Sequence, residues 1–397
     1  MKVLVVGSGG REHALAWALA RGGAEVHAAP GNPGTAAVAQ CHPARAEDPA
    51  AIVPLAAELE ADLVVVGPEA PLVAGLADAL RRRGIAVFGP SAEASRIEGS
   101  KSFAKDVMRA AGVLTARTLS VARPPCVVKA DGLAAGKGVW ICRDADELEA
   151  ALLAAEELGQ PFHVEELLEG PELSVFAIAA GEEAVALPAS RDYKRIGDGD
   201  AGPNTGGMGS FSPVAGAPDV DDLVETIHRP VLRELARRGA PFVGCLYGGL
   251  MLTERGPHVI EFNCRFGDPE VQSLLPRLGG GLLELLAAAA AGELAGAEAP
   301  VSGDAAVTVV IASRDYPARG ESGTPICGIE QAQGAGALVF HAGTALQHGK
   351  VVTNGGRVLD VVGTGATVTE ARAAAYAGVA CIDFPGMQFR TDIAADA

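Results

Sequence analysis

Short apolar runs alternate with amphipathic segments through the first hundred residues, and each run ends in a turn rich in Gly and Pro. Such runs are typical of strands buried on both faces, and Ala14, Leu15, Ala18 and Leu19 recur at the spacing of a helix that packs on them. The pattern predicts strands over 2–6, 25–29, 62–66 and 85–88 and helices over 12–21 and 71–83. Strands alternating with helices predict a parallel sheet with helices on both faces, which binds ligands at the carboxyl ends of its strands.

From about residue 100 the pattern changes, because short strands now follow one another with few helical crossovers. This order predicts an antiparallel α+β unit. Its predicted strands cover 126–130, 139–142, 163–167, 173–179, 183–189, 243–252 and 258–264, and its predicted helices cover 145–158 and 221–238. A polar, Gly-rich stretch at 198–209 is typical of a functional loop.

A turn-rich break at 296–303 precedes a last small unit. We expect its strands at 306–312, 338–341 and 358–362 and its helix at 368–380, where Thr367 and Glu370 are spaced as a capping box. The chain is therefore predicted to be a multidomain protein that combines α/β and α+β units, with domains over 1–100, 101–300 and 301–397.

The composition is that of a folded protein of the cytoplasm. The chain has 397 residues, 49% hydrophobic and 20% charged, which excludes a disordered chain and fits roughly two to four domains. Its net charge of −17 repels phosphate backbones, so we expect no nucleic-acid partner. Seven cysteines without a CxxC pair indicate reduced thiols of a cytosolic protein. No signal-peptide pattern opens the chain, and Glu284 and Glu293 interrupt its most apolar stretch, so we expect no membrane contact.

The first glycine turn, at 7–13, invites a dinucleotide-binding interpretation. That interpretation needs Gly at position 12, where Glu12 stands, and an acidic residue after the second strand, which ends in Ala29 and Pro30. The sequence therefore argues against NAD. Free amides at a helix N-terminus still suit a phosphate, and Arg11 could add a charge; a tight turn without a ligand is the alternative.

A second glycine loop, at 132–138, has three Gly residues and one lysine, Lys137, but not the spacing of a Walker A motif. Just before it, Lys129 stands in an apolar strand, which is costly unless the lysine meets an anion. Together these features predict phosphate binding. An exposed hairpin is the alternative.

The segment 259–265 carries the most specific chemistry. Because side chains alternate along a strand, Ile260, Phe262 and Cys264 fall on one face and supply core, while the other face presents the polar residues Glu261, Asn263 and Arg265. A carboxylate and an amide two residues apart are hard oxygen donors suited to Mg²⁺, whose remaining ligands are waters and phosphates. Arg265 could hold a carboxylate or phosphoryl oxygen. A solvated polar face is the alternative.

A weaker signal lies at 163–168, where an acidic strand end offers backbone groups to an adenine. Glu172, shortly after it, could accept hydrogen bonds from ribose hydroxyls. Acidic strand ends are common, so this pattern alone does not define a site.

These pieces, in this order, resemble the ATP-grasp ligases, and within them the phosphoribosylamine–glycine ligase family. The resemblance is carried by GSGGREHALAW (7–17), APGNPGT (29–35), VGPEAPLV (66–73), FGPS (88–91), EGSKSFAKD (98–106), VVKADGLAAGKGV (127–139), DYKRIGDGDAGPNTGGMGSFSP (192–213), VIEFNCRFGDPE (259–270), FHAGT (340–344) and VTNGGRV (352–358). Two positions depart from the family pattern, because Asp315 and Ala394 stand where Gly is expected.

The resemblance implies an ATP-grasp fold, with a Rossmann-like N-terminal domain, a lid subdomain at about 115–178 and a small C-terminal α+β domain. It implies Mg²⁺ or Mn²⁺ on Glu261 and Asn263, a closing lid at 132–138, and catalytic roles for Arg265, Lys129 and Lys137. The residues it assigns to ATP are Lys105, Lys129, Gly136, Lys137, Gly138, Glu165, Glu166, Leu168 and Glu172. Those it assigns to the other substrates are Gly9, Gly10, Arg11, Glu69, Asp192, Lys194, Asn204, Thr205, Gly206, Gly207 and Arg265.

The activity implied is the joining of glycine to 5-phosphoribosylamine at the expense of ATP, a step of purine synthesis, by a monomer or weak homodimer. Two alternatives remain open. One is another ATP-grasp carboxylate–amine ligase or carboxylase, and the other is a nicotinamide-dependent oxidoreductase built on the first domain.

The alternation around Glu261 gives a direct test. Glu261→Gln keeps the side-chain shape but removes the charge that would neutralise the cation, so turnover should fall at least about 10-fold. Added Mg²⁺ should restore part of it, and the melting temperature should barely change. Turnover is measured against metal concentration, with thermal melting on the same samples. Near-normal turnover at limiting Mg²⁺ would remove Glu261 from the metal site.

Overall fold

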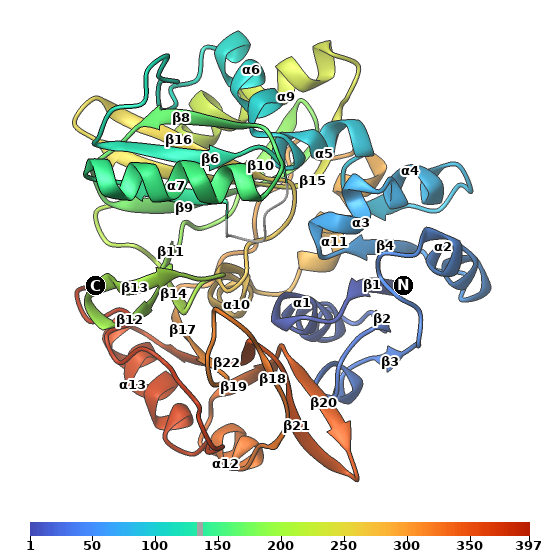
Figure 1. Ribbon diagram of the computed structural model, residues 1–397. Coiled ribbons are helices and arrows are strands. Elements are labelled where there is room, and N and C mark those ends of the chain that lie inside the picture. The colour runs from blue at the N-terminus through green and yellow to red at the C-terminus, as the bar shows by residue number, and fades with distance from the viewer. Residues whose placement is uncertain (133–137) are drawn as a thin grey trace.

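The computed structural model describes residues 1–132 and 138–397 and begins with the expected parallel sheet (Figure 1). Its strand order is β3-β2-β1-β4-β5, and every pair is parallel. Leu4 of β1 belongs to a core that includes Ile52 of α2, whereas Val5 belongs to one that includes Leu15 of α1, so helices cover both faces. The elements are β1 (Lys2–Gly7), α1 (Gly10–Arg21), β2 (Glu25–Pro30), β3 (Gln40–Cys41), α2 (Pro49–Glu58), β4 (Leu63–Val66), α3 (Glu69–Val73), α4 (Leu76–Arg81), β5 (Val87–Phe88) and α5 (Ala92–Gly99).

Two predicted helices are interrupted in the structure. The helix expected over 71–83 is split into α3 and α4, because Gly75 takes a left-handed conformation with φ of 85°. The helix expected over 221–238 consists of α8 (Val220–Leu223), a π-helical turn (Val224–His228) and α9 (Arg229–Arg237). Pro230 has no amide hydrogen to continue the regular helical pattern there.

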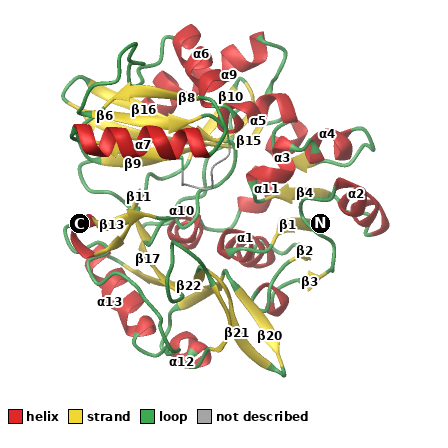
Figure 2. Cartoon of the chain, in the orientation of Figure 1, coloured by secondary structure: helices red, strands yellow, loops and turns green. Residues whose placement is uncertain are grey.

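The described residues in the middle of the chain form two antiparallel sheets of three or more strands, as expected (Figure 2). The smaller, with order β7-β6-β8, packs against α7, and the larger has order β10-β9-β15-β16. A β-bulge between the Gly249 and Leu250 pairings leaves Ile260 without a partner in β15. The elements are α6 (Lys101–Ala111), β6 (Cys126–Ala130), β7 (Val139–Cys142), α7 (Ala145–Glu157), β8 (Phe162–Glu166), β9 (Glu172–Gly181), β10 (Glu183–Ala186), β15 (Phe242–Thr253), β16 (Gly256–Asn263), α10 (Glu270–Leu274) and α11 (Leu282–Ala291).

The C-terminal sheet takes two of its strands from the middle of the chain. Its order is β11-β14-β17-β22-β19, and β11 (Arg191–Asp192) and β14 (Gly209–Ser212) precede residue 300. The domain boundaries at 100 and 300 therefore stay a prediction, and strand pairing crosses the second of them. The other elements are β12 (Arg195–Gly197), β13 (Ala201–Asn204), β17 (Ala305–Ala312), β18 (Glu321–Pro325), α12 (Ile329–Gly334), β19 (Leu338–His341), β20 (Thr344–Gln347), β21 (Lys350–Gly355), β22 (Arg357–Gly365) and α13 (Val368–Val379).

Both departures from the family's glycine pattern fall at strained backbone positions. Asp315 has φ of 63° and Ala394 has φ of 54°, in the left-handed region that glycine adopts readily. The fold thus keeps the conformation that a glycine would favour and accepts a side chain in it.

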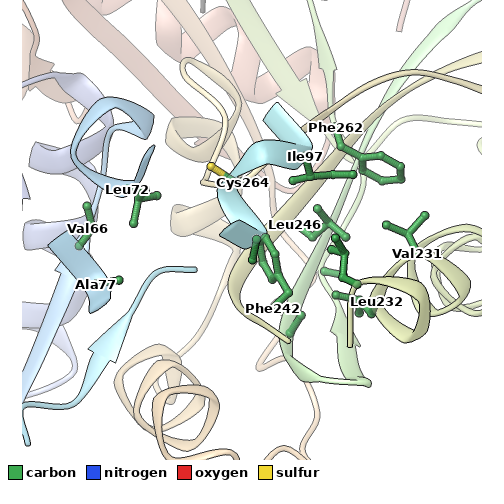
Figure 3. Packing of buried hydrophobic residues seen from close by; sticks show 14 of the residues in the cluster. Val66, Leu72, Ala77, Ile97, Val231, Leu232, Phe242, Leu246, Phe262 and Cys264 are labelled. Carbon is green, nitrogen blue, oxygen red and sulfur yellow. The ribbon is translucent and has the colours of Figure 1, made fainter. Parts of the chain in front are cut away.

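The largest core joins the first sheet to the larger antiparallel sheet. Ile97 of α5 and Phe262 of β16 are both buried in it, and they lie side by side in Figure 3. Phe262 and Cys264 therefore supply core as predicted, whereas Ile260 is only partly buried because the bulge displaces it. No helix in the described part of the chain is long and apolar enough to cross a membrane.

Gly363 allows α13 to lie close against β22. A Cβ at this position would lie 2.2 Å from both the Ala371 carbonyl oxygen and the Ala375 amide nitrogen, which are backbone atoms and cannot turn aside. Gly363→Ala should therefore lower the free energy of unfolding by about 1–3 kcal/mol. Gly334→Ala, where nothing lies within 4 Å of the added carbon, is the control. Equal stabilities of the two variants in denaturant unfolding would contradict this account.

Candidate active site

A cleft of about 880 Å³ lies where the N-terminal sheet, the two antiparallel sheets and the C-terminal sheet meet. Most of the predicted site residues line it. They are Arg11, Glu69, Lys105, Lys129, Gly138, Glu165, Glu166, Leu168, Glu172, Asp192, Lys194, Asn204, Thr205, Gly206, Glu261, Asn263 and Arg265. Gly136 and Lys137 lie outside the described residues. Sequence positions from all parts of the chain thus converge on one cavity.

Glu165 is a buried carboxylate in the cleft wall that forms ion pairs with both Lys105 and Lys129. It is 1% exposed, and its oxygens lie 2.8 Å from Lys105 Nζ and from Lys129 Nζ. His163 Nε2 lies 2.8 Å from one of the same oxygens. Burial opposes the charge on Glu165, but the hydrogen bond with His163 and the charges of Lys129 and Lys105 outweigh it and lower the pKa of Glu165 to about 2. A charged Glu165 therefore holds both lysines at the cleft wall.

Further contacts fix the position of each lysine. Lys105 Nζ donates to Thr115 Oγ1 at 3.0 Å and to the Ala116 carbonyl oxygen, and Lys129 Nζ donates to the Ile260 carbonyl oxygen at 3.1 Å. Ile260 is the residue displaced by the bulge, so the irregularity in β16 presents an acceptor to the lysine. Burial lowers the pKa of Lys105, although the neighbouring Glu165 charge opposes this.

Lys101 is a cleft residue that the sequence reasoning missed. It lines the cavity from the first turn of α6, and its Nζ donates to the Gly132 carbonyl oxygen at 3.3 Å. Burial lowers its pKa, and the nearby Glu261 charge opposes that shift. The sequence contained a signal for Lys101, because lysines four residues apart lie on one face of a helix and the resemblance already assigned Lys105 to ATP.

Arg265 is held by two carboxylates from the N-terminal part of the chain. Its Nε lies 3.3 Å from Glu69, and its Nη2 lies 3.0 Å from Glu98 and donates to Asn263 Oδ1 at 3.1 Å. Burial disfavours the charged guanidinium, but Glu98 and Glu69 outweigh it and raise the pKa of Arg265 above its ordinary value. Glu98, a second missed residue, is anchored by the Cys264 amide at 2.8 Å.

Glu261 and Asn263 point to the same cavity, as their spacing predicted. Among the described residues the Glu261 carboxylate forms no ion pair, while Asn263 Oδ1 accepts the bond from Arg265. No group of three or more His, Cys, Asp and Glu side chains in the described chain could hold a metal ion. A single free carboxylate with an adjacent amide fits a cation that keeps most of its ligands from water and phosphate, as Mg²⁺ does.

Several more carboxylates line the cleft. Lys194 pairs with Glu172, and burial of the lysine is outweighed by Asp192, Glu172 and Glu261, which raise its pKa. Glu166 pairs with Arg117 at 2.8 Å and with Arg255 at 3.2 Å, so its carboxylate is already neutralised.

Arg357 is the third missed residue, and it reaches the cleft from the C-terminal sheet. Its Nη2 lies 3.2 Å from Asp268 Oδ2, and its Nη1 donates to the Gly206 carbonyl oxygen and to the Asp268 carbonyl oxygen. Burial works against the charge of Asp268, but Arg357 and Arg11 outweigh it and lower its pKa. Sequence reasoning had no means to pair residues 357 and 268.

Three predicted glycines, Gly9, Gly10 and Gly207, are not among the cleft-lining residues. The Gly9 amide donates to Glu12 Oε2 at 2.6 Å, and a Cβ on Gly10 would lie 1.9 Å from Asp360 Oδ2. Two carboxylates thus occupy the N-terminus of α1, where a phosphate was expected. Glu12 also fills the space beside Gly7 and Gly67, which agrees with the argument against a dinucleotide.

Family comparisons agree with this arrangement. Residues 1–98 match the N domain of phosphoribosylglycinamide synthetase, residues 99–271 its ATP-grasp (A) domain and residues 306–396 its C domain. A phosphoribosylamine–glycine ligase of Streptomyces coelicolor is 53% identical over 418 residues, covering 100% of this chain and 99% of its own. One of Mycobacterium tuberculosis is 48% identical over 416 residues, covering 99% and 97%.

Solved structures show the same fold. The crystal structure of phosphoribosylamine–glycine ligase from Thermotoga maritima has a TM-score of 0.87 and 37% identity, covering 99% of this chain and 100% of that one. The biotin carboxylase domain of a Hydrogenobacter thermophilus 2-oxoglutarate carboxylase, at 18% identity, has a TM-score of 0.72 and covers 98% and 91%. The fold and cleft define an ATP-grasp ligase. Within that class, the chain belongs to the phosphoribosylamine–glycine ligase family.

Glu165→Gln should leave Lys105 and Lys129 as buried cations without their counter-charge. Removing one partner of a buried ion pair costs about 3–5 kcal/mol, so the free energy of unfolding should fall strongly. Glu166→Gln is the matched control. Its arginine partners are mostly exposed, so that loss should be about 1 kcal/mol or less.

The effect of Glu165→Gln should depend on pH. Because the pKa of Glu165 is lowered from 4.5 to about 2 by folding, its contribution is complete above about pH 4.5 and is lost as the pH falls toward 2. Denaturant unfolding of parent and variant across this range measures the difference. A stability difference that stayed constant with pH would contradict the role assigned to Glu165.

Proposed function

We propose that this chain joins glycine to 5-phosphoribosylamine with the hydrolysis of ATP to ADP and phosphate, forming glycinamide ribonucleotide. The single observation that supports this best is one cleft in which Lys105 and Lys129 face Glu261, Asn263 and Arg265. This cleft occurs in a chain that matches the phosphoribosylglycinamide synthetase domains along almost its full length.

The reaction needs activation of a poor electrophile. The carboxylate oxygen of glycine attacks the γ-phosphorus of ATP, the bond to the β-phosphate oxygen breaks, and glycyl phosphate and ADP result. The amine of 5-phosphoribosylamine then attacks the glycyl carbonyl carbon, phosphate leaves with the bonding electrons, and the amine loses a proton. No protein nucleophile is required, because positioning and charge neutralisation supply most of the catalysis.

Lys105 and Lys129 neutralise the ATP phosphates in this proposal, and Arg265 stabilises the phosphoryl group in transfer. Glu165 holds both lysines in place, so it acts as their positioning residue. The catalytic role proposed for Lys137 concerns a residue outside the described chain. A Mg²⁺ or Mn²⁺ ion, held by Glu261 and Asn263, would add neutralising charge at the phosphates.

The nucleotide lies along the end of β8 in this proposal. The backbone from Glu165 to Leu168 receives the adenine, and Glu172 receives the ribose hydroxyls. Arg11, Glu69 and the segment 204–206, which line the same cleft, bind the remaining substrates. We further propose that the protein works in the cytoplasm, as a monomer or weak homodimer, on small molecules.

The decisive experiment is substrate-dependent ADP release. Glycine and 5-phosphoribosylamine together should drive it, and omission of either should reduce it to background. NADH should not be oxidised under any of these conditions, because Glu12 closes the dinucleotide turn. ADP release with another amino acid or with bicarbonate, but not with glycine, would move the chain to a different ATP-grasp activity. Binding of NAD but not ATP would overturn the proposal.

A further inference from the structure

A second cavity, of about 800 Å³, lies outside the active-site cleft. It is bordered by β10, which is an edge strand of the larger antiparallel sheet, and by residues of the segments 213–221 and 294–301. No described residue lines both this cavity and the cleft. A volume of this size accommodates a small organic molecule, and the roles proposed above leave the second cavity unused.

Arg277 is a buried cation in the wall of the second cavity. It is 6% exposed, its Nε donates to the Asp304 carbonyl oxygen at 2.6 Å, and its Nη1 donates to Ser212 Oγ at 2.6 Å. Its Nη2 donates no hydrogen bond to any described residue. The two bonds therefore fix the guanidinium plane and leave one nitrogen for a ligand.

Arg277 also lacks a full counter-charge. Arg11 and Arg390, the other two arginines buried in the described chain, each pair with a carboxylate oxygen at 2.6 Å. Within the described ranges, no carboxylate lies within ion-pairing distance of Arg277. Burial lowers the pKa of Arg277, and the charge of Asp304 opposes this shift only in part. A buried cation of this kind is costly unless an anion reaches it.

The remainder of the wall is largely apolar. Val185 of β10 and the adjacent Leu187 line one part of the cavity, and Val214, Leu294 and Ala299 line others. Val185, Leu187 and Leu294 are themselves buried, so they form a firm surface. Such walls favour a ligand whose body is hydrocarbon.

The other charged residues of the second cavity restrict the charge that a ligand can carry. Arg229 is already neutralised, because it pairs with Glu225 at 2.9 Å and with Glu183 at 3.2 Å. Asp221 and Glu298 also line the cavity, and both are exposed to solvent. These carboxylates would repel a multiply charged anion such as a phosphate. A single negative charge, placed at the one unpaired guanidinium, is the charge that fits.

We propose that the second cavity binds a small molecule that carries one carboxylate on an aliphatic body, with the carboxylate paired to Arg277. A carboxylate supplies both the missing charge and an acceptor for Nη2, in the planar geometry that a guanidinium prefers. The inference does not depend on the proposed function, because the second cavity and the cleft have no described residue in common. Neither ATP nor glycine should therefore displace the ligand.

Hexanoate is the probe, and hexanamide, which has the same body without the charge, is its neutral counterpart. Binding to the full-length chain is measured by titration calorimetry, with and without ATP and glycine. Hexanoate should bind saturably, and Arg277→Met should raise its Kd roughly 10-fold or more, because a hydrogen bond to a charged group is lost. Hexanamide should bind parent and variant equally weakly. Inorganic phosphate should show no binding that depends on Arg277.

Val301 offers a second test that leaves the buried arginine in place. This side chain lines the second cavity, is 50% exposed, and belongs to the segment whose Ser302 amide donates to the Arg277 carbonyl oxygen at 2.6 Å. Val301→Glu should raise the Kd of hexanoate several-fold by repulsion, whereas Val301→Lys should not raise it. Leu346→Glu, on an apolar side chain that is 64% exposed and lies outside this cavity, is the matched control and should leave the Kd unchanged.

Thermal melting on the same samples shows whether each variant is folded. If Arg277→Met does not fold, the Val301 variants decide the question. Three results would each overturn the proposal. They are no saturable binding of hexanoate at millimolar concentrations, equal Kd values in the parent and in folded Arg277→Met or Val301→Glu, and displacement of hexanoate by ATP or glycine, which would assign its binding to the cleft.

Discussion

Positive charge held inside a protein cleft is the constraint on which this structure depends. A cation removed from water is stable only when a carboxylate and well-placed acceptors replace its hydration. Glu165 meets this need for Lys105 and Lys129, and Glu69 and Glu98 meet it for Arg265. Glu165 lies in β8, Glu69 in α3 and Glu98 in α5. The fold therefore fixes the arrangement of charges before any substrate binds.

Cations held at fixed positions in the cleft also explain how a chain with a negative net charge can bind anionic substrates. A net charge of −17 describes the whole molecule, whereas phosphate recognition depends on a few side chains within one cavity. Lys101, Lys105 and Lys129 all line this cavity.

Local patterns identified the parallel sheet, the antiparallel sheets and the cleft residues Lys129, Glu261, Asn263 and Arg265, and the family resemblance supplied the other predicted residues that line the cleft. Alternation correctly placed Glu261 and Asn263 on the cavity side but failed at Ile260, since a bulge is a property of two paired strands. Lys101 was readable from helical spacing beside Lys105. Arg357 and Glu98 were not readable, because their partners Asp268 and Arg265 are distant in sequence and meet only after the sheets assemble. The helix N-terminus at Gly10 looked open in sequence because Asp360, which lies against it, comes from the last sheet.

The crossing of β14 into the C-terminal sheet sets a limit on how the chain can be divided. β14 pairs with β11 on one side and with β17 on the other, and all four of its residues are buried. A fragment ending before β17 would keep the sheets β7-β6-β8 and β10-β9-β15-β16 but expose one edge of β14, a template for pairing with another copy. It would also lose Arg357, which holds the carbonyl oxygens of Gly206 and Asp268. The last hundred residues therefore contribute to the wall of the cleft. A fusion protein in which another domain replaced them would have to supply a strand that pairs with β14 in the register of β17.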